Sequence, residues 1–165
     1  MHERTALAFV IGLSLGCGSS DSGPPADFNG QYTGTSINGA STCPGQWNMG
    51  ATADGQFNLV QSGNDVQFQA QGAASLAFFV AFGSASFSGK AAGNHVEAAI
   101  VGSVANMTGA CTYTWKGTIS GDLVGDKLNG TLTHTPNTNG NADCDTQMVT
   151  GCSRLTSFSY TRVMR

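Results

Sequence analysis

The sequence predicts an all-β protein, a single eight-stranded antiparallel up-and-down barrel. Apolar and polar residues alternate with period two in eight segments, and Gly- or Asn-containing turns separate most of them. Only 10% of the 165 residues are charged while 23 are glycine, a composition that excludes coiled coils and helical bundles. A closed barrel removes exposed sheet edges, whereas a two-sheet β-sandwich is the alternative arrangement of the same strands.

Residues 1–16 are expected to form a signal peptide. Arg4 gives a weakly positive start, and the apolar run at 6–15 is far shorter than the ~20 residues that span a bilayer. Cys17 follows in a context that resembles a bacterial lipobox, so we expect it to be lipidated. Cleavage without lipidation is the alternative, because small residues before the cysteine also suit ordinary signal peptidase.

Residues 17–26 are small, polar and proline-ended, which is typical of a flexible tether, here a lipid-anchored one. Residues 27–165 form the expected barrel domain. The protein is therefore expected to be exported and anchored through its N-terminal lipid to the bacterial cell envelope, at the outer membrane. A secreted or soluble periplasmic protein is the alternative location.

The clearest hairpin joins residues 113–123 and 128–132 across a Gly125-Asp126 turn. Two further hairpins turn at 62–65 and at Gly93-Asn94. A first strand precedes these hairpins and a last strand follows them. In chain order the eight strands are expected at 28–34, 57–61, 66–70, 85–91, 96–102, 113–123, 128–132 and 155–162.

Large aromatic residues share the inward parity of these strands. Phe57, Phe68, Tyr113 and Trp115 are the residues expected to line a ligand cavity if the barrel is hollow. We expect a filled interior instead, because eight-stranded barrels are often just wide enough for their own side chains. Inward glycines, Gly117 among them, make room for the aromatic rings.

Two segments lie outside the hairpin pattern. Residues 42–54 contain Cys43 and Trp47 and are expected to form a long loop. Residues 73–82 read AASLAFFVAF, without a charge. They fit a buried strand, a short helix that closes the barrel end, or an exposed apolar lip.

The cysteine count supports export. With Cys17 lipidated, four cysteines remain, which an oxidising compartment pairs into two disulfides. Cys144 and Cys152 are close in sequence, so a local bond between them is expected, and Cys43–Cys111 follows by elimination. No Cys-x-x-Cys occurs, so no metal site is expected.

Gly30-Gln31-Tyr32 directly after the tether, together with Arg162 in the last strand, resembles the calycin barrels, the lipocalins and their relatives. The resemblance implies that Arg162 stacks on Tyr32, where those families carry Trp. The chain also resembles small bacterial lipoproteins with Tyr-Thr-Gly-Thr at 32–35 and Cys-Pro-Gly at 43–45, followed by paired cysteines. That second resemblance implies no activity.

The net charge of −3 argues against nucleic acid as a partner on electrostatic grounds. Serine-nucleophile and phosphate-loop motifs are absent, although a Ser-His-Asp arrangement with His95 or His134 stays open. We expect no catalytic residue and no cofactor.

The leading hypothesis is a non-enzymatic envelope lipoprotein with a structural or protein-binding role. Its partner, an envelope protein, is expected to contact loops 38–55 and 136–152. The alternatives are a lipocalin-like carrier of a small apolar ligand and a loop-borne envelope enzyme or inhibitor.

Overall fold

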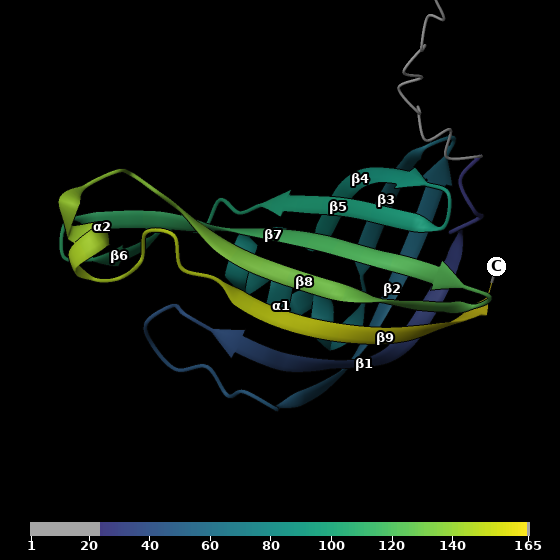
Figure 1. Ribbon diagram of the computed structural model, residues 1–165, viewed down its shortest axis with the longest axis horizontal. Helices are drawn as coiled ribbons and strands as arrows, with labels where there is room; N and C mark the ends of the chain where they lie inside the picture. Colours follow the sequence, from purple (N-terminus) through teal and green to yellow (C-terminus); the bar gives the residue numbers. More distant parts are fainter. Residues whose placement is uncertain (1–23, 165) are drawn as a thin grey trace, which may run out of the picture.

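The computed structural model describes residues 24–164, which form nine strands and two short helices (Figure 1). The strands are β1 (Gly30–Ser41), β2 (Thr52–Ser62), β3 (Asp65–Ala70), β4 (Ser86–Ala92), β5 (His95–Val101), β6 (Asn106–Thr108), β7 (Cys111–Val124), β8 (Lys127–Thr138) and β9 (Arg154–Met164). The helices are α1 (Gly72–Phe82) and α2 (Ala142–Thr146). The predicted signal peptide and Cys17 lie outside the described residues.

Eight of the strands close into an antiparallel barrel. Consecutive strands pair along the order β5-β4-β3-β2-β1-β9-β8-β7, and β5 pairs with β7 to complete the ring. The remaining strand, β6, pairs only with the first residues of β7. The predicted up-and-down barrel is confirmed over the sandwich, and each of the eight predicted segments is a barrel strand. β1 and β8 run several residues further than the sequence predicted.

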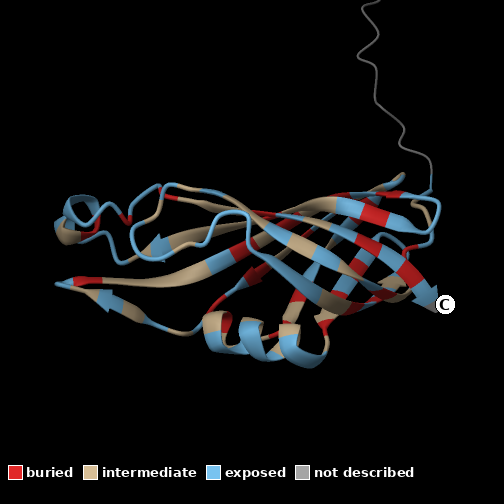
Figure 2. Cartoon of the chain, turned by 90° about the horizontal axis from the view of Figure 1, so that it is seen from below, coloured by how far each residue is buried: buried red, intermediate tan, exposed pale blue. Residues whose placement is uncertain are grey.

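The period-two pattern places apolar side chains inside the barrel. Along β5, Val96, Ala98 and Ile100 are buried while Glu97 between them is exposed. Buried residues accordingly gather inside the barrel, whereas α1 shows a largely exposed outer side (Figure 2). Gly117 shows why glycine occurs at inward positions: a Cβ there would lie 2.9 Å from a carbon of Ile100 and would crowd the neighbouring rings.

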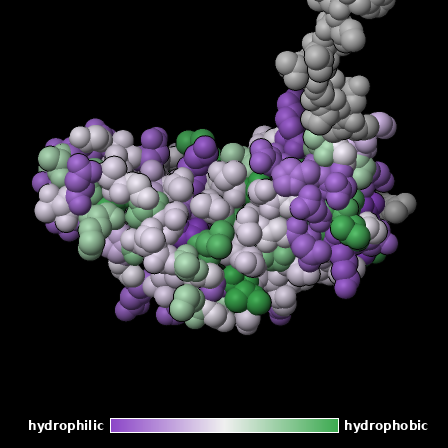
Figure 3. All heavy atoms as spheres, in the orientation of Figure 1, coloured by the Kyte–Doolittle hydropathy of each residue, from purple (hydrophilic) through white to green (hydrophobic). Residues whose placement is uncertain are grey.

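The chain segment before β1 closes one end of the barrel. Phe28 and Tyr32 are fully buried, and the Tyr32 hydroxyl donates to the Phe28 carbonyl at 3.1 Å. The Arg162 guanidinium lies 5.4 Å from the Tyr32 ring centroid and donates to the Asp27 carbonyl at 2.6 Å. The expected Tyr32–Arg162 contact is therefore present. On the face shown in Figure 3, hydrophilic residues gather over this end of the barrel.

Residues 73–82 form a helix, so the buried-strand interpretation is wrong. The segment is rich in alanine, the residue with the highest helix propensity. The chain enters at Gly72 with φ +56° and leaves at Gly83 with φ +77°, and the Gly83 N–H donates to the Phe79 carbonyl at 2.8 Å. Left-handed glycines at both ends separate the helix from the strands on either side.

Helix α1 lies against the barrel at the end opposite the Phe28 closure. Phe78 and Phe82 point toward the core, where their rings lie 5.3 and 6.4 Å from the ring of Phe87. The opposite side of the helix faces outward, with Leu76 and Val80 each 67% exposed and Phe79 60% exposed. The segment is therefore both a partial closure of the barrel and an exposed apolar surface.

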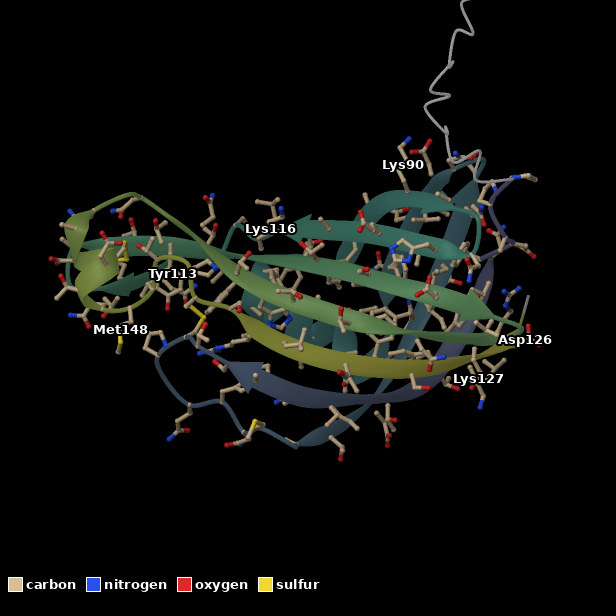
Figure 4. The ribbon with its side chains drawn as sticks, viewed as in Figure 1. Lys90, Tyr113, Lys116, Asp126, Lys127 and Met148 are labelled. Carbon is tan, nitrogen blue, oxygen red and sulfur yellow. A yellow bond between two sulfur atoms is a disulfide. The ribbon has the colours of Figure 1, made fainter. Side chains whose placement is uncertain are left out.

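The β7–β8 hairpin extends beyond the barrel as an arm that carries β6 and α2 (Figure 1). Its register continues to the pair Tyr113 and Thr138. The labelled side chains of Tyr113 and Met148 lie in this arm, at the far left of Figure 4. Cys111, Cys144 and Val149 form a small core of their own there.

The two disulfides join Cys43 to Cys152 and Cys111 to Cys144, so the predicted pairing is wrong. The extended hairpin carries residues 139–146 out to Cys111 at the start of β7. The chain then returns to the barrel rim, where the Thr42 N–H donates to the Ser153 carbonyl at 2.9 Å and brings Cys152 beside Cys43. The predicted Cys144–Cys152 bond rested on nearness in sequence. It is wrong because β7 and β8 extend beyond the barrel and place Cys144 in the arm, away from Cys152 at the rim.

Removing the rim disulfide is expected to cost more stability than removing the arm disulfide. On the chain-entropy model the Cys43→Ala/Cys152→Ala variant loses about 5 kcal/mol of unfolding free energy and Cys111→Ala/Cys144→Ala about 4 kcal/mol, because the first bond closes the longer loop. Urea unfolding of both variants measures this order. Peptide mapping without reduction is the control, and a Cys144–Cys152 peptide would contradict the pairing.

Candidate ligand-binding site

A cavity of about 420 Å³, partly open to solvent, lies in the barrel at the end covered by α1. The filled interior expected from the strand number is therefore wrong. Several positions that face this space carry small residues, such as Ser36 on β1, Gly55 on β2 and Ala74 on α1. Since protein interiors otherwise pack closely, the small side chains of Ser36 and Ala74 leave a volume that the larger side chains opposite do not fill, whereas the Tyr160 hydroxyl already occupies the space beside Gly55.

The buried part of the wall is almost entirely apolar. It combines side chains from strands all around the barrel, namely Tyr32, Leu59, Phe68, Ile119, Leu128 and Leu132. Tyr32, whose hydroxyl already donates to the Phe28 carbonyl, contributes its ring. An apolar wall of this kind is typical of a site for a small hydrophobic molecule, which gains free energy by leaving water.

Aromatic rings form the middle of the wall. Phe57 packs edge-on against Tyr160 at 5.1 Å between ring centroids, and Phe78 from α1 lies 6.1 Å from Phe57. Burial raises the pKa of the Tyr160 hydroxyl, and the hydrogen bond of that hydroxyl with Ser36 lowers it in part. The Tyr160 hydroxyl therefore stays protonated at neutral pH and is a neutral polar group.

Polar and exposed residues gather where the cavity meets the end of the barrel. Asn38 and Asp54 lie at the facing ends of β1 and β2, with Ala53 and Asp54 exposed. Thr156 on β9 donates to the Asn38 side chain at 3.4 Å. The mouth of the cavity is therefore polar on the β1–β2 side and apolar on the α1 side.

His134, Trp47 and Arg154 meet at the same end of the barrel. The His134 ring lies edge-on to Trp47 at 6.2 Å, and the Arg154 guanidinium lies 5.3 Å from the Trp47 ring. His134 and Trp47 line the cavity, and Arg154 lies behind them. Burial and the nearby Arg154 charge lower the pKa of His134 to about 4, so this histidine is neutral at pH 7.

Two of the four predicted lining residues border the cavity. Phe57 and Phe68 line it, whereas Tyr113 and Trp115 do not. Tyr113 packs on the small core of the arm, and Trp115 lies 4.9 Å from the Arg154 guanidinium. Tyr113 and Trp115 both lie at inward positions of β7. At Tyr113, however, the strand is already outside the barrel, so the alternation pattern alone wrongly predicted that this ring lines the barrel interior.

Sequence reasoning missed His134, Trp47 and Tyr160. The alternation Leu128, Gly130, Leu132 continues in register to His134, so the inward parity of this histidine could have been found in the sequence. Trp47 carried no such signal because it lies in the β1–β2 loop. Its indole N–H donates to the Gly39 carbonyl at 2.8 Å, a contact that only the folded loop creates.

A Ser-His-Asp arrangement does occur, on the outside of the barrel. His95 Nδ1 lies 2.9 Å from Asp122 Oδ1, and its Nε2 lies 3.3 Å from Ser120 Oγ. At these positions β7 is paired with β5 on one side and β8 on the other, so its backbone N–H groups belong to the sheet. The described β7 backbone at this cluster therefore offers no free N–H group to stabilise an oxyanion in acyl transfer.

No protein-family model, curated protein or solved structure matches the chain. Between residues 24 and 164, no three His, Cys, Asp or Glu side chains are grouped so that they could hold a metal ion. Neither helix within that range has the length and apolar character needed to cross a membrane.

Acidification is expected to destabilise the fold through His134. The pKa of this group is about 4 in the folded protein and about 6.5 in an unfolded chain, so the unfolded chain takes up the proton first as the pH falls. The contribution of the neutral His134 side chain to the free energy of unfolding is fully present above about pH 6.5. By about pH 4 this free energy has fallen by roughly 3 kcal/mol.

The His134→Gln variant should lose this part of the pH dependence. Urea unfolding of both proteins between about pH 7.5 and 4 measures it. Both proteins share every carboxylate, so the difference between their two stability curves reports His134. Parallel curves would show that His134 does not titrate in this way.

Proposed function

We propose that the protein binds a small apolar molecule inside the barrel. The observation that carries the proposal is the apolar cavity of about 420 Å³ at the α1 end. Ligand pockets commonly range from about 300 to 1,000 Å³, and dry apolar cavities take up apolar guests. A volume of about 30 Å³ per water-sized group gives room for roughly a dozen such groups.

Helix α1 is the natural place of entry. It contributes Ala73, Ala74, Ala77 and Phe78 to the cavity wall while its opposite side is exposed and apolar. Gly72 and Gly83 give the chain conformational freedom at both ends of the helix. A ligand that enters here passes the apolar side chains of α1, in contrast to the hydrogen-bonded closure around Phe28 at the other end.

Filling the cavity should abolish binding without unfolding the protein. N-phenyl-1-naphthylamine, a neutral fluorescent probe, should bind the wild-type protein saturably at one site. Ala74→Phe places a ring into the cavity from α1 and should weaken binding by roughly tenfold or more. Fluorescence titration measures both affinities.

Val80→Phe is the matched control, because Val80 lies on the exposed side of the same helix. It should leave the probe affinity unchanged, and the melting temperature of each variant shows that it is folded. Absence of saturable binding to the wild-type protein, or equal binding to both variants, would contradict the proposed function.

We further propose that the protein acts outside the cytoplasm, anchored by lipid at Cys17. The two disulfides support an oxidising compartment, where such bonds persist. The described chain begins at the Phe28 end of the barrel, so a tether attached there leaves α1 and the cavity mouth at the far end (Figure 1). An anchored carrier of this form presents its cavity away from its point of attachment.

Cys17→Ser is expected to release the protein from the membrane fraction. Mass spectrometry of the natively purified wild-type protein should find an acyl-modified Cys17 at the mature N-terminus. The Cys111→Ala/Cys144→Ala variant is a control that changes cysteines and leaves the anchor intact. A membrane-bound Cys17→Ser protein, together with an unmodified wild-type Cys17, would overturn the anchor.

A further inference from the structure

Two buried polar atoms at the α1 end have no hydrogen-bond partner in the described part of the chain: His134 Nε2 and Arg154 Nε. The two residues are directly opposite each other on β8 and β9. Buried polar groups in proteins are nearly always hydrogen-bonded, and an unsatisfied one is costly. Two such atoms on neighbouring residues, one of which lines the cavity, point to a polar partner from outside the described chain.

The charge of Arg154 is not balanced within residues 24–164. No carboxylate there forms an ion pair with it, and its Nη2 donates to the neutral Pro44 carbonyl at 2.9 Å. Its guanidinium lies 5.3 Å from the Trp47 ring and 4.9 Å from the Trp115 ring. Arg162 at the other end also has two buried nitrogens without a hydrogen bond in the described chain, Nε and Nη1, but its charge is balanced by Asp27 and Asp126, each 3.6 Å away.

His134 is in place to contact a bound molecule directly. It lines the cavity, with its ring held edge-on against Phe82 at 5.5 Å and Trp47 at 6.2 Å. As a neutral imidazole it carries one N–H, and with that proton on Nε2 it donates. Arg154 behind it contributes positive charge, which favours a negative group at the same end of the cavity.

The remaining titratable groups of the cavity wall lie elsewhere. Asp54, the one carboxylate of the wall within the described residues, is on β2, and β1 and β9 separate it from β8. The hydroxyl groups of Tyr32 and Tyr160 stay neutral, because burial raises the pKa of each. The His134 side of the mouth is therefore the positive side.

We propose that the ligand is a single-chain amphipathic acid, whose anionic headgroup lies against His134, with Arg154 behind that histidine, and whose apolar chain extends toward Leu128 and Tyr32. This inference rests on the proposed function and specifies its ligand class. With the proton of His134 on Nε2, the headgroup supplies the acceptor for that N–H, and its negative charge balances the charge of Arg154. The apolar wall beyond accepts a chain of roughly a dozen carbon atoms.

Three probes with the same chain and different headgroups test the inference. Dodecanoate, 1-dodecanol and dodecylammonium, each kept below its aggregation concentration, compete with N-phenyl-1-naphthylamine at neutral pH. Dodecanoate should bind roughly tenfold or more tighter than 1-dodecanol, and dodecylammonium should bind most weakly. Dodecanoate should also change the tryptophan fluorescence, since both tryptophans lie over Arg154.

Single substitutions test which side chains cause the preference for dodecanoate over 1-dodecanol. Arg154→Met and His134→Phe should each bring the affinities for dodecanoate and 1-dodecanol close together, whereas His134→Gln keeps an N–H donor and most of the preference. Lys116→Met is the matched control. It removes a positive charge from an exposed position on β7 and should leave the preference unchanged. His134→Phe retains the ring packing and decides the matter if Arg154→Met does not fold.

The outcomes separate the two proposals. Equal affinity for dodecanoate and 1-dodecanol, or tightest binding of dodecylammonium, overturns the headgroup inference and leaves the apolar-ligand function standing. A dodecanoate preference that persists in folded Arg154→Met and His134→Phe overturns it as well. If neither the fluorescent probe nor any dodecyl compound binds saturably, the proposed function itself is wrong.

Discussion

Closure of the sheet is the constraint on which the rest of this structure depends. Pairing of β5 with β7 and of β1 with β9 leaves eight strands to enclose one interior. An interior of that size is either filled by its own side chains or holds one small ligand. The size of the inward side chains decides between a filled interior and a cavity. In this barrel, one side carries large inward side chains and the other side carries small ones.

On one side large rings fill the space. Phe82 and Phe87 pack over Gly117, where even a methyl group would collide. On the β1–β2 side the inward residues include Ser36 and Gly55, and the cavity lies next to them. A change of one or two atoms at Ser36 would alter the cavity volume with little change to the sheet, whereas a methyl group at Gly55 would collide with the Tyr160 hydroxyl.

The arginines at the two ends of the barrel, Arg162 and Arg154, have different surroundings. Arg162 is enclosed by Tyr32, a backbone carbonyl and two carboxylates, so its burial completes a closed end. Arg154 has aromatic faces and one carbonyl around it but no carboxylate among residues 24–164. A balanced charge stabilises a closed structure, whereas an unbalanced one beside a cavity favours a ligand that supplies the missing charge.

The sequence by itself determined the strands, because the two faces of a strand differ in burial and alternation records that difference locally. It also indicated that Phe57 and Phe68 face inward. The tertiary structure alone decided the disulfide pairing, since the length by which β7 and β8 pass the barrel brings Cys144 to Cys111. It alone also revealed the cavity and the meeting of Trp47, His134 and Arg154, because volumes and contacts depend on residues far apart in the chain.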